Sequence, residues 1–172
     1  MRRIRRILVA VKDPLARSSP ALTKGAQLAI ALGAQVELFH ALADPLIVRE
    51  GDRGAASPAR RARGEAEAAR EALERVAARI RRHGVDVHSH ALWDHPAHEA
   101  IARRALGTHA DLIVLERHGG PHRVPWLLSY SDWEVLRLAA CPVLLVKSAR
   151  PWRRPAVLAA VCLLYTSPSP PD

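Results

Sequence analysis

The histidines are the side chains of this chain best suited to metal or acid–base chemistry, and there are nine. Four of them, His88, His90, His95 and His98, cluster in a short stretch. Imidazole is a common zinc ligand, so this spacing admits a metal site. No cysteine accompanies the cluster, and histidines at i and i+2 of a strand are equally explained as exposed titrating groups. We predict no metal site. We also predict no catalytic residue, because no spacing specifies a Ser/His/Asp set or paired carboxylates.

A second candidate for chemistry is the loop of residues 118–123, which reads His-Gly-Gly-Pro-His-Arg. Gly119 and Gly120 leave its backbone bare, and the flanking basic side chains make it cationic. Such a loop can meet a nucleotide phosphate or another anion, although an ordinary solvated loop explains the same residues. Further along, Ser131-Asp132-Trp133 is typical of a helix start, with Ser131 as the N-cap and Trp133 packed inward.

Alternating strands and helices must position these residues. Ser19 and Pro20 mark the start of the first helix, and Gly33, Gly84 and Gly107 are expected helix stops. The expected strands cover residues 4–11, 36–41, 85–92, 111–115 and 142–146, the expected helices cover residues 20–33, 58–83, 96–106 and 131–139, and residues 44–56 form a surface loop. This alternation predicts an α/β fold, a five-stranded parallel Rossmann-like sheet with helices on both faces and ligands at the carboxyl ends of the strands.

Composition narrows the class of protein. The 172 residues are 49% hydrophobic and 25% charged, as in one globular domain. No apolar stretch is long enough for a membrane span or a signal peptide, and Cys141 and Cys162 have no metal or redox spacing, so we predict a cytoplasmic protein without a membrane partner. The net charge of +9 suggests nucleic-acid binding. Arginine dominates the basic residues, however, as a G+C-rich genome would produce, and no aromatic residues interleave them, so nucleic acid is not the expected partner.

Three segments in order, Arg6–Val11, Ala110–Val114 and Cys141–Val146, together resemble the universal stress protein family over residues 1–148. The details resemble the amino-terminal half of the UspE-like tandem members of that family. They are Asp13-Pro14 followed by Pro20-Ala21-Leu22, Leu92-Trp93 before His95, Ser131-Asp132-Trp133, and Val146-Lys147.

The resemblance implies the adenine-nucleotide alpha-hydrolase-like form of the Rossmann fold and binding of ATP or AMP. In the family a loop G-x2-G-x9-G-[ST] follows the fourth strand, and its backbone approaches the phosphates. On this chain the four positions fall on Glu116, Gly119, Ser129 and Tyr130, so one glycine remains. The first-strand corner where family members hold adenine falls on Asp13, or on Lys12 if the register moves by one residue, and the Asp-Pro match assigns it to Asp13. The candidate nucleotide-binding residues are Asp13, Gly119, Gly120, Ser129 and Ser131.

These substitutions predict a non-enzymatic regulatory or scaffolding module of the stress response with a degenerate adenine-nucleotide site. Glu116 places a carboxylate where phosphates should lie, and the side chains of Ser129 and Tyr130 block close approach of the backbone. Two alternatives remain open. One is an ATP-binding or ATP-hydrolysing protein with a rearranged glycine loop, and the other is a basic nucleic-acid-binding protein that uses the arginines of the long helix.

The end of the chain suggests a second unit. After a linker at residues 149–155, Ala156–Val161 echoes the first strand and is expected to begin a truncated second universal stress protein domain. Residues 162–172 read as translated sequencing adapter, and a genuine Pro/Ser-rich tail is the alternative. The expected partner is therefore a second such domain or, in a homodimer, another copy paired through the last strand, Val143–Val146, because edge pairing buries an exposed ladder.

Overall fold

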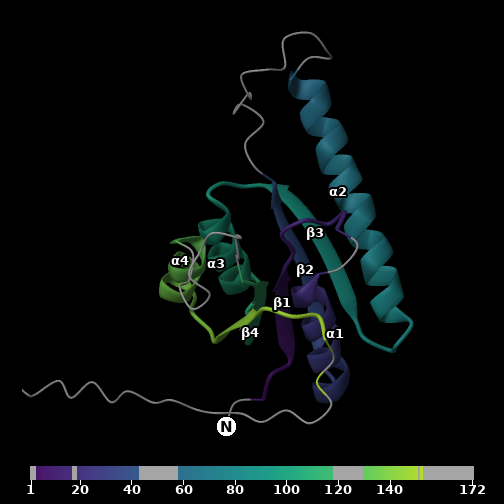
Figure 1. Ribbon diagram of the computed structural model, residues 1–172, viewed down its shortest axis with the longest axis vertical. Coiled ribbons are helices and arrows are strands. Elements are labelled where there is room, and N and C mark those ends of the chain that lie inside the picture. Colours follow the sequence, from purple (N-terminus) through teal and green to yellow (C-terminus); the bar gives the residue numbers. More distant parts are fainter. Residues whose placement is uncertain (1–2, 17–18, 43–57, 118–129, 151, 153–172) are drawn as a thin grey trace, which may run out of the picture.

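A computed structural model describes residues 3–16, 19–42, 58–117, 130–150 and 152. Helices and strands alternate throughout them (Figure 1). The elements are β1 (Arg6–Ala10), α1 (Pro20–Leu32), β2 (Gln35–Leu42), α2 (Pro58–Arg81), β3 (Val87–Trp93), α3 (Ala97–Gly107), β4 (Leu112–Glu116), α4 (Tyr130–Leu138) and β5 (Val143–Val146). The predicted order of elements is confirmed, with ends that differ by one or two residues. The predicted surface loop at residues 44–56 lies outside the described part.

The five strands form one parallel sheet in the order β3-β2-β1-β4-β5. β1 is central, and Val9 pairs in register with Leu38 of β2 and with Val114 of β4. Its side chains are buried on both faces of the sheet. This explains the continuous apolar run that predicted a central parallel strand.

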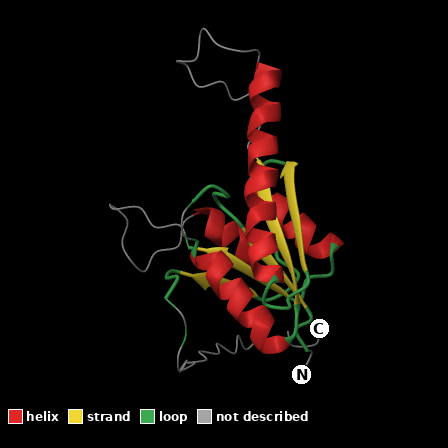
Figure 2. Cartoon of the chain, turned by 90° about the vertical axis from the view of Figure 1, so that its right-hand side faces the viewer, coloured by secondary structure: helices red, strands yellow, loops and turns green. Residues whose placement is uncertain are grey.

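Helices cover both faces and divide the core into two layers. Ile7, Val9 and Val36 pack with α1 and α2, whereas Leu8 and Phe39 pack with α3 and α4. Figure 2 shows the strands between these helices, with α2 extending past the end of the sheet. The predicted α/β fold with helices on both faces is confirmed.

Local chemistry explains the ends of α1. Ser19 has extended backbone and its Oγ accepts a hydrogen bond from the Leu22 N–H, while Pro20 begins the helix. Gly33 ends it with a left-handed φ of 61°, a conformation that side-chain-bearing residues avoid. The prediction for α3 needs a correction. Gly107 is its last helical residue rather than a glycine stop beyond it, and Thr108 is the cap.

Candidate functional site

The strand order reverses at β1, so topology makes the region beyond the carboxyl ends of β1 and β4 the expected ligand site, which is called the crevice below. Three segments meet at this edge of the sheet. They are the turn after β1, the start of α1 and the end of β4. Crevices of this kind receive ligands in open α/β folds because no crossover covers them.

Glu116 and Ser19 connect β4 to α1 across this crevice. Glu116 is the last residue of β4, and its Oε2 accepts a hydrogen bond of 3.5 Å from Ser19 Oγ. Ser19 is 8% exposed and also accepts from the Leu22 N–H at 3.3 Å. A carboxylate therefore lies at the amino end of α1, where the helix dipole favours negative charge.

Asp13, which the family resemblance assigns to the adenine corner, lies three residues after the end of β1. Its carboxylate accepts from the Leu15 N–H at 2.9 Å, and its carbonyl oxygen accepts from the Ala16 N–H at 3.3 Å. The first bond makes an Asx turn and the second makes a β-turn, and together they shape the loop. The Asp13 side chain is exposed to solvent.

His40 belongs to the same edge of the sheet, and the sequence analysis missed it. Its Nδ1 lies 2.8 Å from the carbonyl oxygen of Val11, and the Val11 N–H donates to the carbonyl of Phe39 at 2.8 Å. These two contacts extend the pairing of β1 and β2 past the end of β1. A single histidine in an apolar strand has no spacing signal, so only the register of the two strands reveals it.

Of the remaining residues predicted to bind the nucleotide, Ser131 lies in a described element and the other three do not. Gly119, Gly120 and Ser129 lie outside the described residues. α4 begins at Tyr130, so Ser131 is its second helical residue. The prediction that Ser131 is the N-cap is therefore wrong, because the N-cap precedes the first helical residue.

The prediction that Trp133 packs inward is also wrong. Trp133 is 57% exposed, whereas its neighbour Asp132 is completely buried. Val135, three residues after Asp132, is buried too, so this face of α4 meets the sheet. Asp132 lies in the first turn of α4, where the helix dipole stabilises a carboxylate. The spacing of Asp132 and Val135 was available in the sequence, but the large apolar side chain of Trp133 was the stronger indication of a buried position.

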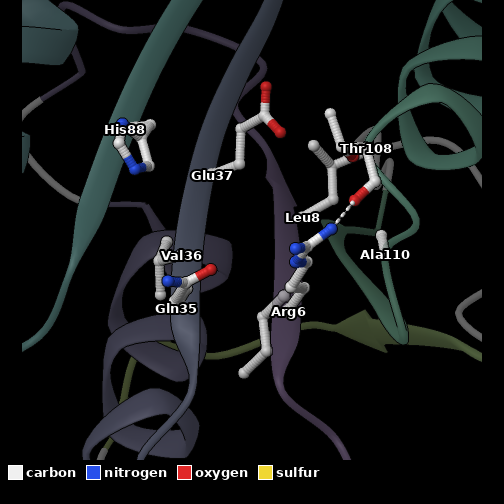
Figure 3. Close-up of a pocket in the computed structure, with 9 residues that line it drawn as sticks. Arg6, Leu8, Gln35, Val36, Glu37, His88, Thr108 and Ala110 are labelled. Atoms are coloured by element: carbon white, nitrogen blue, oxygen red, sulfur yellow. Dashed lines mark hydrogen bonds between the residues drawn. The ribbon is translucent and has the colours of Figure 1, made fainter.

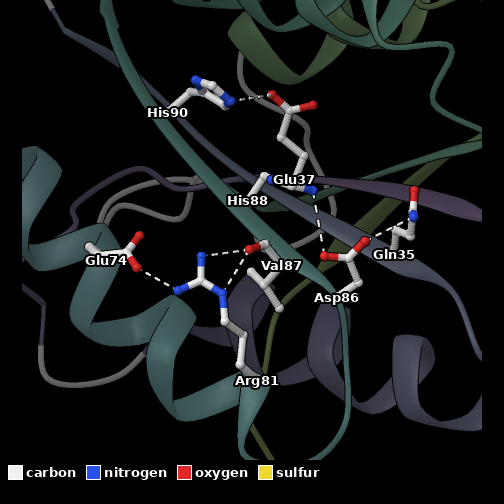
Figure 4. A network of polar contacts seen from close by, with 8 residues as sticks. All are labelled: Gln35, Glu37, Glu74, Arg81, Asp86, Val87, His88 and His90. Carbon is white, nitrogen blue, oxygen red and sulfur yellow. Dashed lines mark hydrogen bonds and ion pairs between the residues drawn. The ribbon is translucent and has the colours of Figure 1, made fainter.

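Three histidines of the predicted cluster, His88, His90 and His95, are exposed, and His98 is half-buried. His88 lies 3.5 Å from Asp86 and His90 lies 3.9 Å from Glu37 (Figure 4). Burial lowers the pKa of His90, and the positive charge of Arg104 lowers it further, against the opposing effect of Glu37. Within the described ranges, no three His, Cys, Asp or Glu side chains come together as metal ligands.

Arg81 and Glu74 organise the outer edge of the sheet beside this cluster (Figure 4). Nε of Arg81 donates to the carbonyl oxygen of Val87 at 2.9 Å, and its Nη1 forms an ion pair with Glu74. Glu74 also accepts from Ser89 Oγ at 2.8 Å. The hydrogen bond from Arg81 lowers the pKa of Glu74 most, and the one from Ser89 adds to it. These bonds tie the last turns of α2 to β3.

A cavity of about 250 Å³ lies at the opposite end of the sheet from the crevice. It opens beside the first residues of β1, and Arg6 at its wall donates to the carbonyl oxygen of Thr108 at 3.0 Å (Figure 3). Glu37 and His88 line its other side (Figure 3). Because Arg6, Ile7 and Leu8 begin β1, this cavity is not the crevice predicted for a nucleotide.

Comparison with known proteins decides the family. The sequence profile of the universal stress protein family matches residues 3–147. The chain belongs to the universal stress protein family. None of the helices in the described residues is long and apolar enough to cross a bilayer. No curated protein sequence matches this universal stress protein at a significant level.

Solved structures confirm the universal stress protein fold. A protein of this family from Burkholderia pseudomallei is 24% identical, with a TM-score of 0.61, and the match covers 83% of this chain and 96% of that one. A universal stress protein of Archaeoglobus fulgidus in complex with dAMP is 22% identical, with a TM-score of 0.55 and coverage of 85% and 100%. A Pseudomonas aeruginosa protein described as a universal stress protein is 25% identical, with a TM-score of 0.64, and this chain covers only 45% of it although 87% of this chain is matched.

Proposed function

We propose that this domain is a regulatory or scaffolding module of the stress response whose adenine-nucleotide site is degenerate. The contact between Glu116 and Ser19 carries the proposal. Glu116 stands where the family pattern has the first glycine of its phosphate loop, and its carboxylate lies at the amino end of α1. A carboxylate at the end of β4 repels phosphates that approach the loop following this strand, and its position at the amino end of α1 stabilises its negative charge.

The ligand that the family context favours is an adenine nucleotide, ATP or AMP. The dAMP complex of the Archaeoglobus fulgidus protein supports the base and sugar part of this assignment. Asp13, Gly119, Gly120, Ser129 and Ser131 are the residues proposed to contact such a ligand, with Asp13 at the base. Weak binding is the expectation, because binding the base does not offset the repulsion between Glu116 and the phosphates.

Isothermal titration with ATP and AMP, with and without Mg²⁺, tests the degenerate site. We expect no heat that fits a single site at micromolar nucleotide. Micromolar, magnesium-dependent binding of ATP to the wild-type domain would refute the proposal.

Hydrolysis of ATP by a rearranged glycine loop is the enzymatic alternative. It requires that Gly119 and Gly120 bring bare backbone to the phosphates without the other family glycines. Phosphate release measured with and without Gly119→Val separates the two: turnover that this substitution abolishes would establish an enzyme, and absence of turnover agrees with the regulatory module.

A groove beside α2 favours a second candidate, binding of a polyanion such as nucleic acid. Arg75, Arg79 and Arg82 follow one another at helical spacing and line a hollow of about 790 Å³ against Pro14–Ala16. Arg75 is 3.7 Å from Glu71, which partly neutralises this stripe. A gel shift that weakens steeply with salt and is lost in Arg79→Glu would support nucleic-acid binding. No shift at low salt would end this candidate.

The proposed partner is a second universal stress protein unit or a second copy, paired through β5. Within the described residues β5 pairs only with β4, so its other edge presents unpaired backbone groups. The Pseudomonas aeruginosa protein, of which this chain spans 45%, supports the tandem arrangement.

A further inference from the structure

Lys24 is the only basic side chain buried in the described part of the chain, with 2% of it exposed. It lies in the middle of α1, a helix whose buried face carries Ala21, Gly25 and Ala29. Burying an ammonium group costs several kcal/mol unless a partner compensates. A lysine at this position therefore indicates that another segment both covers it and contacts it.

That segment is the chain that follows β5, which Figure 1 shows passing across to α1. Nζ of Lys24 donates a hydrogen bond to the carbonyl oxygen of Arg150. The same Nζ lies 4.0 Å from the centre of the Trp152 ring, within the range of a cation–π interaction. One strand-end segment thus supplies both an acceptor and an aromatic face to a single buried cation.

Gln27, one helical turn after Lys24, holds the backbone of the same segment. Its Nε2 donates to the carbonyl oxygen of Trp152 at 3.0 Å, and its Oε1 accepts from the Trp152 N–H at 3.3 Å. Both backbone groups of Trp152 are therefore satisfied by one side-chain amide. This bidentate contact specifies position and direction, which a lone surface contact would not do.

The contacts also give the direction of the segment. Arg150 meets Lys24 and Trp152 meets Gln27, so the segment runs parallel to α1. In a parallel α/β sheet the helices run opposite to the strands. The chain therefore turns back after β5 and runs toward the amino ends of the strands, instead of continuing along the outer edge of β5.

We propose that Lys24 and Gln27 form a docking site on α1 for Arg150 and Trp152, and that this contact, called the latch, directs the segment after β5 toward the amino ends of the strands. A hollow of about 350 Å³, lined by Lys24, Leu144, Lys147 and Trp152, lies between the latch and β5. The latch keeps this segment off the outer edge of β5, an edge that no described strand pairs with and that the proposed partner would use. This last consequence rests on the proposed pairing through β5, whereas the latch itself does not.

The lysine content makes a direct test possible, because Lys12, Lys24 and Lys147 are the only lysines of the chain. Lys12 and Lys147 are exposed and act as internal references. Amine acetylation of the full chain under native conditions, followed by mass spectrometry, measures each rate. We expect Lys24 to react at least about tenfold more slowly than either reference, since reaction requires the latch to open.

Trp152→Leu is the decisive variant, and Trp133→Leu is its matched control. Trp152 lies after the last strand and Trp133 is 57% exposed on α4, so neither change removes core packing. The latch predicts that Trp152→Leu raises the rate at Lys24 at least about fivefold and that Trp133→Leu leaves it unchanged. Equal rates at all three lysines in the wild type, or unchanged protection of Lys24 in Trp152→Leu, would overturn the proposal. Light scattering separately reports pairing through β5, so failure of that partner proposal remains distinguishable.

Discussion

Ser19 has two functions at the scale of a single residue. It caps α1 by accepting from the Leu22 N–H, and it donates to Glu116 at the end of β4. One hydroxyl can do both because it has a donor proton and acceptor lone pairs. The start of a helix and the predicted phosphate position are therefore coupled through one atom.

Replacing Ser19 tests its capping role. We expect Ser19→Ala to lower the free energy of unfolding by about 1 kcal/mol, because it leaves the N-terminal N–H groups of α1 without their cap. Ser19→Asn should recover most of this loss, since asparagine caps equally well. Chemical denaturation of the three proteins measures the difference. Equal midpoints for Ser19→Ala and wild type would show that the cap contributes nothing.

His90 predicts how stability depends on pH. Burial lowers its pKa, so the folded protein favours the neutral ring. A histidine whose folded pKa is lowered contributes stability that is fully present above its unfolded pKa near 6.5 and is lost as the pH falls below 6.5 and through the lower folded pKa. We expect His90→Gln to lose less thermal stability than wild type between pH 7.5 and pH 5. An NMR titration in which His90 protonates above the range of a free histidine would contradict this account.

At the scale of a single element, Gly25 determines how closely α1 packs against β1. A Cβ on Gly25 would lie 2.4 Å from Cγ2 of Val9, so α1 approaches β1 as closely as a glycine permits. This contact fixes the helix that carries Ser19, Lys24 and Gln27. The position of α1 over the crevice therefore depends on a missing side chain.

Gly25→Ala should consequently destabilise the domain. We expect a loss of about 1–3 kcal/mol, because Val9 is completely buried and cannot move aside. Gly64→Ala in α2 is the matched control, since nothing lies within 4 Å of an added Cβ there and alanine favours a helix. Urea denaturation should move the two variants in opposite directions. A stabilised Gly25→Ala variant would show that the packing of α1 on β1 is loose.

The elements were predictable because apolar periodicity and helix-end residues are local signals. Ser19, Pro20 and Gly33 mark α1 within two residues, and the apolar runs mark the strands. The orientation of α4 was not predictable in the same way. Local pattern favours burial of Trp133, yet the tertiary contacts bury Asp132 and Val135 instead.

For the whole molecule, the expected place of the candidate site follows from the topology. The side-chain contacts at that place do not. Strand order 3-2-1-4-5 agrees with the predicted parallel α/β fold, and its reversal at β1 makes the carboxyl ends of β1 and β4 the expected ligand site. The contacts of Glu116 with Ser19 and of Lys24 with Arg150 and Trp152 join residues about a hundred positions apart. No local sequence signal encodes such pairs, so they were found only in three dimensions.

The universal stress protein fold thus supports one view of this chain. The domain keeps the family scaffold, β5 pairs only with β4 within the described residues, and we propose that the Glu116 carboxylate occupies the phosphate position. On this view the function depends on partners held through β5 and on the direction in which the latch sends the chain. The nucleotide crevice is then a structural remnant whose own residues keep phosphates away.

The most direct test of this view compares ATP binding by wild type, Glu116→Gln and Glu116→Gly in one set of isothermal titrations with Mg²⁺. Glu116→Gln keeps the size of the side chain and removes its charge, and Glu116→Gly restores the family residue. We predict that both variants bind ATP at least about tenfold more tightly than wild type, because repulsion of the phosphates is removed. Micromolar binding by the wild type, or equal affinities for all three proteins, would contradict the central claim.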